Sequence, residues 1–271
     1  MRVGIIGGGS IARLFLEHIR RGDLGDVKVV AVAGQSGASR GKALAQEFGC
    51  AFVTHLAGLV AERPDVVIEA ASHQAVREHV VSLLEKGIAV VVLSGGALCD
   101  DGLRTALEQA AIKSGALLYV PSGGIAGLDA LKAACIAGVD AVTITVIKPP
   151  GAWKNIPYVG EQKVDLDGLT SAHTFYDGPA RQGVPLFPQN VNIAAVLSMA
   201  GIGFDKTRLK VVADPAIKHN THEIEISGRT GNITIRLQNV PAPDNPKTAW
   251  LACYSALAAL KLMKTPIRYG T

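Results

Sequence analysis

The sequence is poor in aromatic residues and in charge. Only six phenylalanines, five tyrosines and two tryptophans occur in 271 residues, and charged residues make up 18% of the chain. Few rings are therefore available to stack on bases. The basic residues behind the net charge of +4 and the pI of about 8.9 are scattered along the chain. This composition argues against nucleic acid as a partner and favours small anionic molecules.

Cysteine and long apolar runs are scarce as well. The four cysteines form no CxxC pair and sit in apolar stretches, so we expect core thiols in a reducing cytoplasm: Cys50, Cys99, Cys135 and Cys253. The run IAVVVL has the length of a strand, far short of the ~20 residues of a membrane helix. The first residues, MRVGIIGGG, place a glycine turn where an export signal needs an apolar core. We therefore expect a soluble, cytoplasmic protein with no membrane partner.

The apolar residues that are present, 48% of the chain, suffice for one large or two modest domains. Up to residue 120, short β-branched runs alternate with helical segments, which is typical of a parallel sheet with crossover helices. The expected strands are 3–6, 28–33, 51–53, 65–69, 88–93 and 117–120.

After residue 120 the pattern changes to alternating strands, which indicate a mainly antiparallel sheet with one covered face. These strands are 141–147, 209–213, 222–227 and 232–238, and GRTG at 228–231 forms a hairpin turn between the last two. Helices are expected around 124–137, 190–200 and 246–263. The last helix carries little polarity, so we expect it to pack back onto the first domain or onto a partner subunit.

A glycine-rich turn follows the first strand. Gly7-Gly8-Gly9-Ser10-Ile11-Ala12 matches G-x-G-x-x-G/A between a strand and an amphipathic helix, which is the context that the motif requires. Gly7 permits the tight turn, Gly9 lets the backbone approach a pyrophosphate, and Ala12 allows close packing of helix on strand. The alternative is a glycine turn that merely packs tightly. The context favours dinucleotide binding.

The end of the second strand bears on the choice of cofactor. A carboxylate there binds the ribose diol of NAD and repels the 2′-phosphate of NADP. This chain reads AVAGQSGASR, without an acid, and Ser36 and Arg40 are the candidates to accept the phosphate. We predict that NADP is accepted at least as well as NAD.

Several later motifs resemble the L-aspartate dehydrogenase family. They are PSGGIAGLDAL (121–131), FPQNVNIAA (187–195), ADPAIKHNTHEIEI (213–226) and NPKTAWLACYSAL (245–257), together with VVIEAAS and LSGGAL in the first half. The similarity covers nearly the whole chain in the right order. Such a series is far more specific than the glycine turn alone.

The resemblance implies a fold and a reaction. The fold would be α/β: a Rossmann-type domain over 1–120, followed by an α+β catalytic and dimerisation domain over 121–271, in a homodimer. The enzyme would oxidise L-aspartate with NAD or NADP to iminosuccinate, which water converts to oxaloacetate and ammonia. Its cellular role would be supply of iminoaspartate for pyridine nucleotide synthesis, or aspartate breakdown. An acidic residue is common in the family at the end of the second strand, and this chain departs from that pattern.

The resemblance also assigns roles to residues. The family's histidine in N-x-H-E-I falls on His222, and its nicotinamide contacts fall on Ala126 and Asn192. His219 is not the equivalent residue, and we interpret it as a loop residue. A histidine with an ordinary pKa near ~6.5 can take a proton from the substrate amine or from water.

Periodicity alone leaves other readings of these two histidines open. His222, Ile224 and Ile226 share one strand face, and a histidine on a covered face is more often a hydrogen-bonded core residue than a catalyst. A metal site is disfavoured because a three-residue spacing on a strand puts the two rings on opposite faces, with no further ligand close in sequence. The family resemblance favours an acid/base role for His222.

A dicarboxylate substrate needs cationic or amide partners. The candidates are Lys148, Asn220 and the pair Lys247 and Thr248, although a lysine at a strand end is usually just solvated. The competing functions are a homoserine dehydrogenase, a dihydrodipicolinate reductase, and a catalytically silent nucleotide sensor that keeps only the first domain. The combination of FPQNVN with NTHEI favours the aspartate enzyme.

Overall fold

A computed structural model describes residues 1–35, 40–188, 190–242 and 245–269. It divides into two compact units. Unit 1 comprises Met1–Pro121 and Ser255–Pro266, and unit 2 comprises Ser122–Tyr254 and the residues that follow Pro266. Among the described residues, no helix has the length and apolarity that a bilayer-spanning segment requires.

Unit 1 is built on a six-stranded parallel sheet in the order β3-β2-β1-β4-β5-β6. The strands are β1 (Arg2–Ile6), β2 (Lys28–Ala33), β3 (Ala51–Val53), β4 (Val66–Glu69), β5 (Ala89–Val92) and β6 (Leu118–Tyr119). The order reverses between β1 and β4, as in a Rossmann fold. The predicted parallel sheet and its six strands are confirmed; β1, β2, β4 and β5 are largely buried runs rich in valine and isoleucine, whereas β3 and β6 are short and half-buried.

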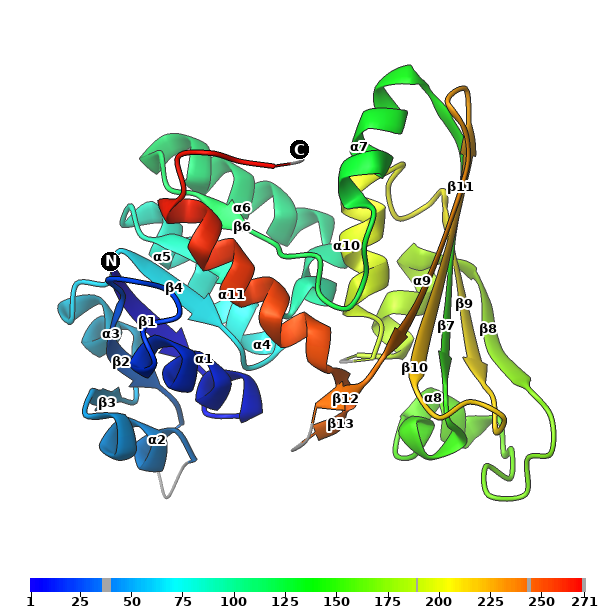
Figure 1. Ribbon diagram of the computed structural model, residues 1–271, viewed down its shortest axis with the longest axis horizontal. Helices are drawn as coiled ribbons and strands as arrows, with labels where there is room; N and C mark the ends of the chain where they lie inside the picture. The colour runs from blue at the N-terminus through cyan, green and yellow to red at the C-terminus, as the bar shows by residue number, and fades with distance from the viewer. Residues whose placement is uncertain (36–39, 189, 243–244, 270–271) are drawn as a thin grey trace. The chain divides into compact units, whose positions relative to one another are not determined.

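Helices surround this sheet (Figure 1). They are α1 (Ser10–Arg20), α2 (Arg40–Phe48), α3 (Leu56–Ala61), α4 (His73–Ala75), the π-helical η1 (Val76–Val80), α5 (Val81–Glu85), the 3₁₀ turn η2 (Gly95–Cys99) and α6 (Asp101–Ser114). The core combines Phe15 and Leu16 of α1 with Ile5 and Ile68 of the strands. The last helix, α11 (Trp250–Lys264), adds Ala256, Leu257 and Leu260 to the same core.

Unit 2 is built on a five-stranded sheet in the order β11-β10-β7-β9-β8. The strands are β7 (Val139–Lys148), β8 (His173–Pro179), β9 (Thr207–Ala213), β10 (Asn220–Gly228) and β11 (Gly231–Asn239). Only the β7–β9 pair is parallel, so the predicted mainly antiparallel sheet and the 228–231 hairpin are confirmed. Strand β8 escaped prediction because HTFYDGP carries aspartate, glycine and proline, which are typical of turns.

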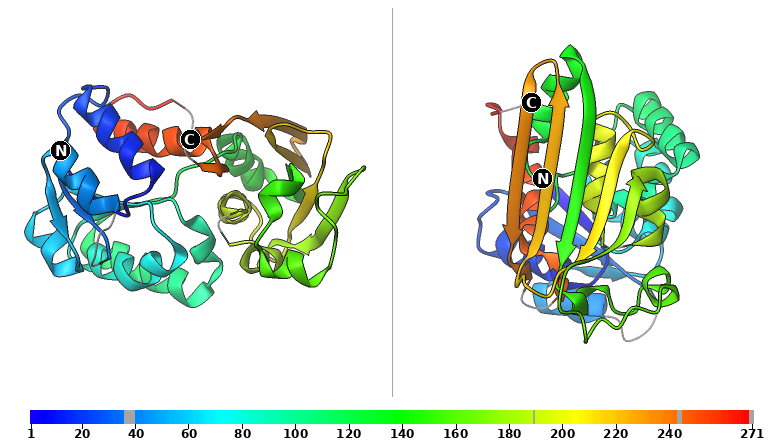
Figure 2. Two further views of the ribbon diagram at one scale, coloured as in Figure 1. Left: turned by 90° about the horizontal axis from the view of Figure 1, so that it is seen from below. Right: turned by 90° about the vertical axis from the view of Figure 1, so that its right-hand side faces the viewer.

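One face of the second sheet is covered. Val142, Ile144 and Val146 of β7 and Ile224 and Ile226 of β10 are buried, whereas Glu223 and Glu225 are not. Helices α7 (Leu128–Ala137) and α10 (Asn192–Ala200) lie along the covered face (Figures 1 and 2). The remaining elements are η3 (Pro150–Trp153), α8 (Pro157–Glu161), α9 (Ala180–Leu186), β12 (Pro241–Ala242) and β13 (Asn245–Ala249).

Two helices begin four residues later than predicted. The helix expected at 124–137 begins at Leu128, because Gly123 and Gly127 adopt φ values of +67° and +79°, outside the helical region. The helix expected at 246–263 begins at Trp250, because 245–249 pairs with β12 as a strand. Both errors lie where glycine or proline makes the local pattern ambiguous.

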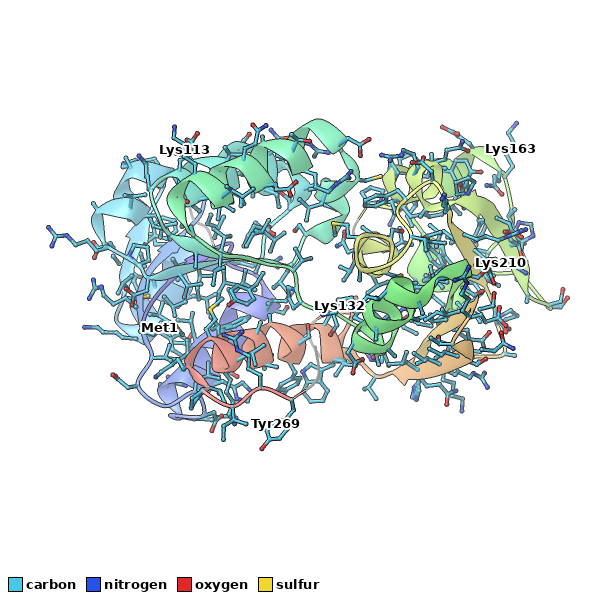
Figure 3. The ribbon with its side chains drawn as sticks, turned by 90° about the horizontal axis from the view of Figure 1, so that it is seen from above. Met1, Lys113, Lys132, Lys163, Lys210 and Tyr269 are labelled. Carbon is cyan, nitrogen blue, oxygen red and sulfur yellow. The ribbon has the colours of Figure 1, made fainter. Side chains whose placement is uncertain are left out.

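The four cysteines are buried to different depths. All four cysteines are free thiols: Cys253 is buried, Cys50 is half-buried but packs against the core of unit 1, and Cys99 and Cys135 are half-buried. The expectation of core thiols was therefore wrong for Cys99 and Cys135. In unit 2, Lys132 lies on α7, Lys163 follows α8 and Lys210 lies on β9, so these basic residues come from separate elements (Figure 3).

Candidate active site

A pocket of about 670 Å³ opens in unit 1 at the carboxyl ends of β1 and β2. In an open α/β sheet, ligands bind outside the carboxyl ends of the strands where the strand order reverses. The wall includes the glycine turn, the start of α2, the start of α3 and the loop after β4; its residues include Gly7, Gly8, Gly9, Arg40, His55 and Ser72.

The three glycines of the turn differ in what a side chain would meet. Gly7 has φ +115°, and a Cβ there would lie 2.5 Å from the carbonyl oxygen of Ala70. A Cβ on Gly8 would collide with the backbone of Gly41. A Cβ on Gly9 would meet nothing within 4 Å, so packing does not require glycine at that position. The space beside the α-carbon of Gly9 is therefore open to a ligand.

The amino terminus of α1 fits an anion. Gly9 is its N-cap and supplies no side-chain hydrogen bond, and the first turn holds no acidic residue. The backbone N–H groups and the dipole of an 11-residue helix favour a phosphate there. Ala12 is fully buried and packs against the strands, as the motif predicts. These residues fit the diphosphate of a dinucleotide.

We predict that Gly9→Ala folds normally and binds cofactor at least about 10-fold more weakly, because the new methyl group occupies the approach of the diphosphate. Gly8→Ala should instead lower the free energy of unfolding, because its methyl group collides with backbone. Urea unfolding and fluorescence titration with cofactor measure the two effects. Gly160→Ala, where a Cβ also meets nothing within 4 Å, is the control. Unchanged cofactor affinity in Gly9→Ala would refute the assignment.

The other predicted cofactor residues are placed as follows. Arg40 is the exposed first residue of α2 and lines the pocket, whereas Ser36 lies outside the described residues. The end of β2 continues into Gly34 and Gln35, which line the same pocket and carry no charge.

A buried carboxylate behind the loop that lines the pocket after β4 escaped sequence reasoning. Glu69, the last residue of β4, accepts hydrogen bonds from the backbone N–H groups of Ala71 (2.8 Å) and Ser72 (2.9 Å). It also accepts from the N–H (3.0 Å) and the hydroxyl (2.9 Å) of Ser94. Burial raises the pKa of Glu69, and these donors oppose the rise. Glu69 thereby fixes the loops after β4 and β5. In the sequence, a glutamate at the end of an apolar strand, VVIE, was the signal that could have indicated this buried carboxylate.

A second cluster, in unit 2, surrounds His222. Its side chain is 3% exposed, on the covered face of β10, as the alternation predicts. Nδ1 lies 3.0 Å from the carbonyl oxygen of Gly124, and the amide nitrogen of Asn239 donates to the same oxygen at 2.9 Å. Burial lowers the pKa of His222 to about 4; the bond to Gly124 opposes this, and the charge of Lys148 adds to it. The imidazole is therefore neutral at physiological pH.

Lys148 is buried, not solvated. It ends β7, is 3% exposed, and its ammonium group donates to the carbonyl oxygen (3.3 Å) and the side-chain oxygen (3.2 Å) of Asn190. The ammonium group also lies 5.3 Å from the ring centroid of Trp153. A buried cation whose field reaches a neutral histidine suits recognition of a carboxylate.

The remaining predicted residues differ in position. Asn220 is buried at the start of β10, and Asn192 is the half-buried first residue of α10. Ala126 is exposed in the loop before α7, and His219 is exposed before β10. The predicted helix start at Lys247 and Thr248 was wrong, because both lie in β13. Within the described ranges, no group of three metal-ligating side chains occurs.

The lowered pKa of His222 predicts that the free energy of unfolding depends on pH. The unfolded state binds a proton at pH 6.5 and the folded state only near pH 4, so stability is present above pH 6.5 and falls as the pH drops towards 4. The loss is roughly 3 kcal/mol of unfolding free energy. Urea unfolding of the wild type and of His222→Gln at pH 7.5 and pH 4 measures it. Equal losses in the two proteins would contradict the prediction.

Comparison with known proteins gives the family. Residues 129–263 match the family model for the carboxyl-terminal domain of aspartate dehydrogenase, and residues 7–121 match the NAD-binding domain of homoserine dehydrogenase.

L-aspartate dehydrogenase of Methanosarcina mazei is 38% identical over 272 residues, covering 100% of both chains. That of Methanosarcina acetivorans is 44% identical over 207 residues, covering 76% of each. The crystal structure of aspartate dehydrogenase from Thermotoga maritima superposes with a TM-score of 0.77 at 27% identity, covering 100% of this chain and 99% of that one. The chain belongs to the L-aspartate dehydrogenase family.

Proposed function

We propose that the protein is an NAD(P)-dependent L-aspartate dehydrogenase that converts L-aspartate through iminosuccinate to oxaloacetate and ammonia. The observation that carries the proposal is a buried, neutral histidine within the field of a buried lysine, in a chain of this family. Residues 1–120 would bind the dinucleotide, and residues 121–271 would carry the chemistry and the contacts of a homodimer.

His222 acts as the acid/base. When bound, the oxidised nicotinamide supplies the acceptor for the hydride on the α-carbon of aspartate. His222 takes the proton from the substrate amine and releases it to solvent after hydride transfer. In the second half of the reaction it takes a proton from the water that attacks the imine carbon and returns it to the nitrogen that leaves as ammonia. The low pKa keeps the imidazole ready to accept these protons at neutral and alkaline pH.

Lys148 binds one substrate carboxylate through its ammonium group. Burial strengthens this interaction, because water does not screen it. Asn220, which opens β10 beside the end of β7, and Lys247 with Thr248 complete the substrate contacts in the proposal. Ala126 and Asn192 contact the nicotinamide half of the cofactor.

NADP serves at least as well as NAD in this proposal. The end of β2 lacks the carboxylate that would repel a 2′-phosphate, and Arg40 lines the pocket as a cation. Ser36 is the second phosphate contact. Titration with both cofactors tests this: Arg40→Ala should weaken NADP and leave NAD nearly unchanged, and a clear wild-type preference for NAD would overturn it.

The activity itself is tested by formation of reduced nicotinamide at alkaline pH with L-aspartate or L-homoserine. L-Homoserine is included because the first half of the chain matches a homoserine dehydrogenase domain. Turnover with aspartate alone supports the proposal. Turnover with homoserine alone identifies the rival enzyme, and tight cofactor binding without turnover on either substrate contradicts a dehydrogenase of this specificity. The cellular role in the proposal is cytoplasmic supply of iminoaspartate to pyridine nucleotide synthesis.

A further inference from the structure

Asn239 is a buried amide that touches His222 and has no part in the function proposed so far. It ends β11, next to β10, and is 5% exposed. Its amide nitrogen lies 2.9 Å from the carbonyl oxygen of Gly124 and 3.1 Å from Nδ1 of His222. With the 3.0 Å separation of Nδ1 from that oxygen, the three atoms form a nearly equilateral triangle.

The donor and acceptor properties of the three atoms decide which hydrogen bonds form among them. The Gly124 oxygen only accepts, and the Asn239 nitrogen only donates. The two N–H bonds of an amide diverge too widely for both to aim along adjacent sides of such a triangle. If Asn239 donated to Nδ1, the buried Gly124 oxygen would receive no donor from either side chain, which is costly. All three atoms are satisfied when Nδ1–H and the Asn239 amide both donate to Gly124.

The packing around Gly124 leaves this carbonyl little freedom. A Cβ on Gly124 would lie 2.9 Å from Cβ of Ala249 and 3.4 Å from Cε1 of His222. The absence of a side chain therefore lets the loop before α7 approach the imidazole closely. The amide nitrogen of Asn239 lies 3.6 Å from the same Cβ position and holds the carbonyl from a strand of the sheet that also carries His222.

We infer that Asn239 is a positioning residue that, through the carbonyl of Gly124, holds His222 as the Nδ1–H tautomer and leaves the Nε2 lone pair as the base. Lys148, from β7, is the charged group whose field acts on His222, and Gly124 and Asn239 add no charge. An uncharged partner keeps the imidazole neutral, whereas a carboxylate at position 239 would favour the imidazolium form. The catalytic part of this inference rests on the proposed function, but the tautomer does not.

The first test is spectroscopic and needs no turnover. The ¹⁵N chemical shifts of the His222 ring at pH 7.5, assigned by loss of the signals in His222→Gln, distinguish a protonated from an unprotonated nitrogen. We expect a protonated Nδ1 and an unprotonated Nε2 in the wild type, and a mixture of tautomers in Asn239→Ala. A wild-type ring protonated on Nε2 would overturn the inference even if the variant failed to fold.

The second test is kinetic. Asn239→Ala should lower kcat about 10- to 100-fold with an unchanged KM for the cofactor, because the base is no longer held in one orientation. Asn239→Asp should move the acid limb of the kcat/KM profile upward by at least about one pH unit. Wild-type kcat in Asn239→Ala, or an unmoved profile in Asn239→Asp, would overturn the positioning role. Absence of aspartate turnover in the wild type would instead refute the proposed function and leave the tautomer test standing.

Discussion

His222→Ala is expected to lose about 10² to 10⁴ in kcat with L-aspartate while binding the dinucleotide as tightly as the wild type. In the proposed mechanism the loss follows from removing the group that accepts the substrate proton, and burial keeps that imidazole neutral. The cofactor pocket and its glycine turn belong to unit 1, whereas His222 belongs to unit 2. Steady-state kinetics and cofactor titration measure the two quantities separately.

The control for this variant is Glu225→Gln. Glu225 lies three residues along the same strand, on its other face, and is exposed. It should keep the wild-type kcat, which separates the loss of the imidazole from a general disturbance of β10. If His222→Ala turned over aspartate at near the wild-type rate, His222 would be an ordinary core histidine. Addition of imidazole should restore part of the rate in the alanine variant, because the missing group is a base.

Lys148→Met is expected to lower kcat/KM for L-aspartate about 10- to 100-fold, the cost of one hydrogen bond to a charged group. Methionine keeps an unbranched chain against Trp153 but carries no charge. The acid limb of the pH profile should also move to higher pH, because the charge of Lys148 disfavours the imidazolium form of His222 and its removal raises that pKa.

The measurement is kcat/KM between pH 4 and pH 9 with aspartate as the varied substrate. Lys206→Met, which neutralises an exposed lysine in the same unit, should behave as the wild type and controls for net charge. An unchanged KM for aspartate in Lys148→Met would show that Lys148 is only a buried structural cation. The free energy of unfolding, measured in parallel, distinguishes that outcome from a poorly folded variant.

The fold was largely predictable because its information is local. The six strands of unit 1 are short apolar runs between helical segments, and four strands of unit 2 alternate with a period of two. Strands covered on both faces read as continuous apolar runs, and strands covered on one face alternate between apolar and polar residues. The prediction failed where local preference misleads: β8 reads as a turn, and 245–249 reads as the start of a helix although it pairs with β12.

The roles at the site depend on contacts between distant residues. The sequence by itself determined the two-part architecture, the glycine turn, the family, and His222 as the histidine on the covered strand face. Only the tertiary structure decided the states of these groups. It buried Lys148 against Asn190 and Trp153, and it lowered the pKa of His222 by excluding water from it. It brought Asn239 and Gly124, 115 residues apart, onto one hydrogen bond beside that ring. Burial and hydrogen bonding are properties of neighbours in space, which the order of residues along the chain does not display.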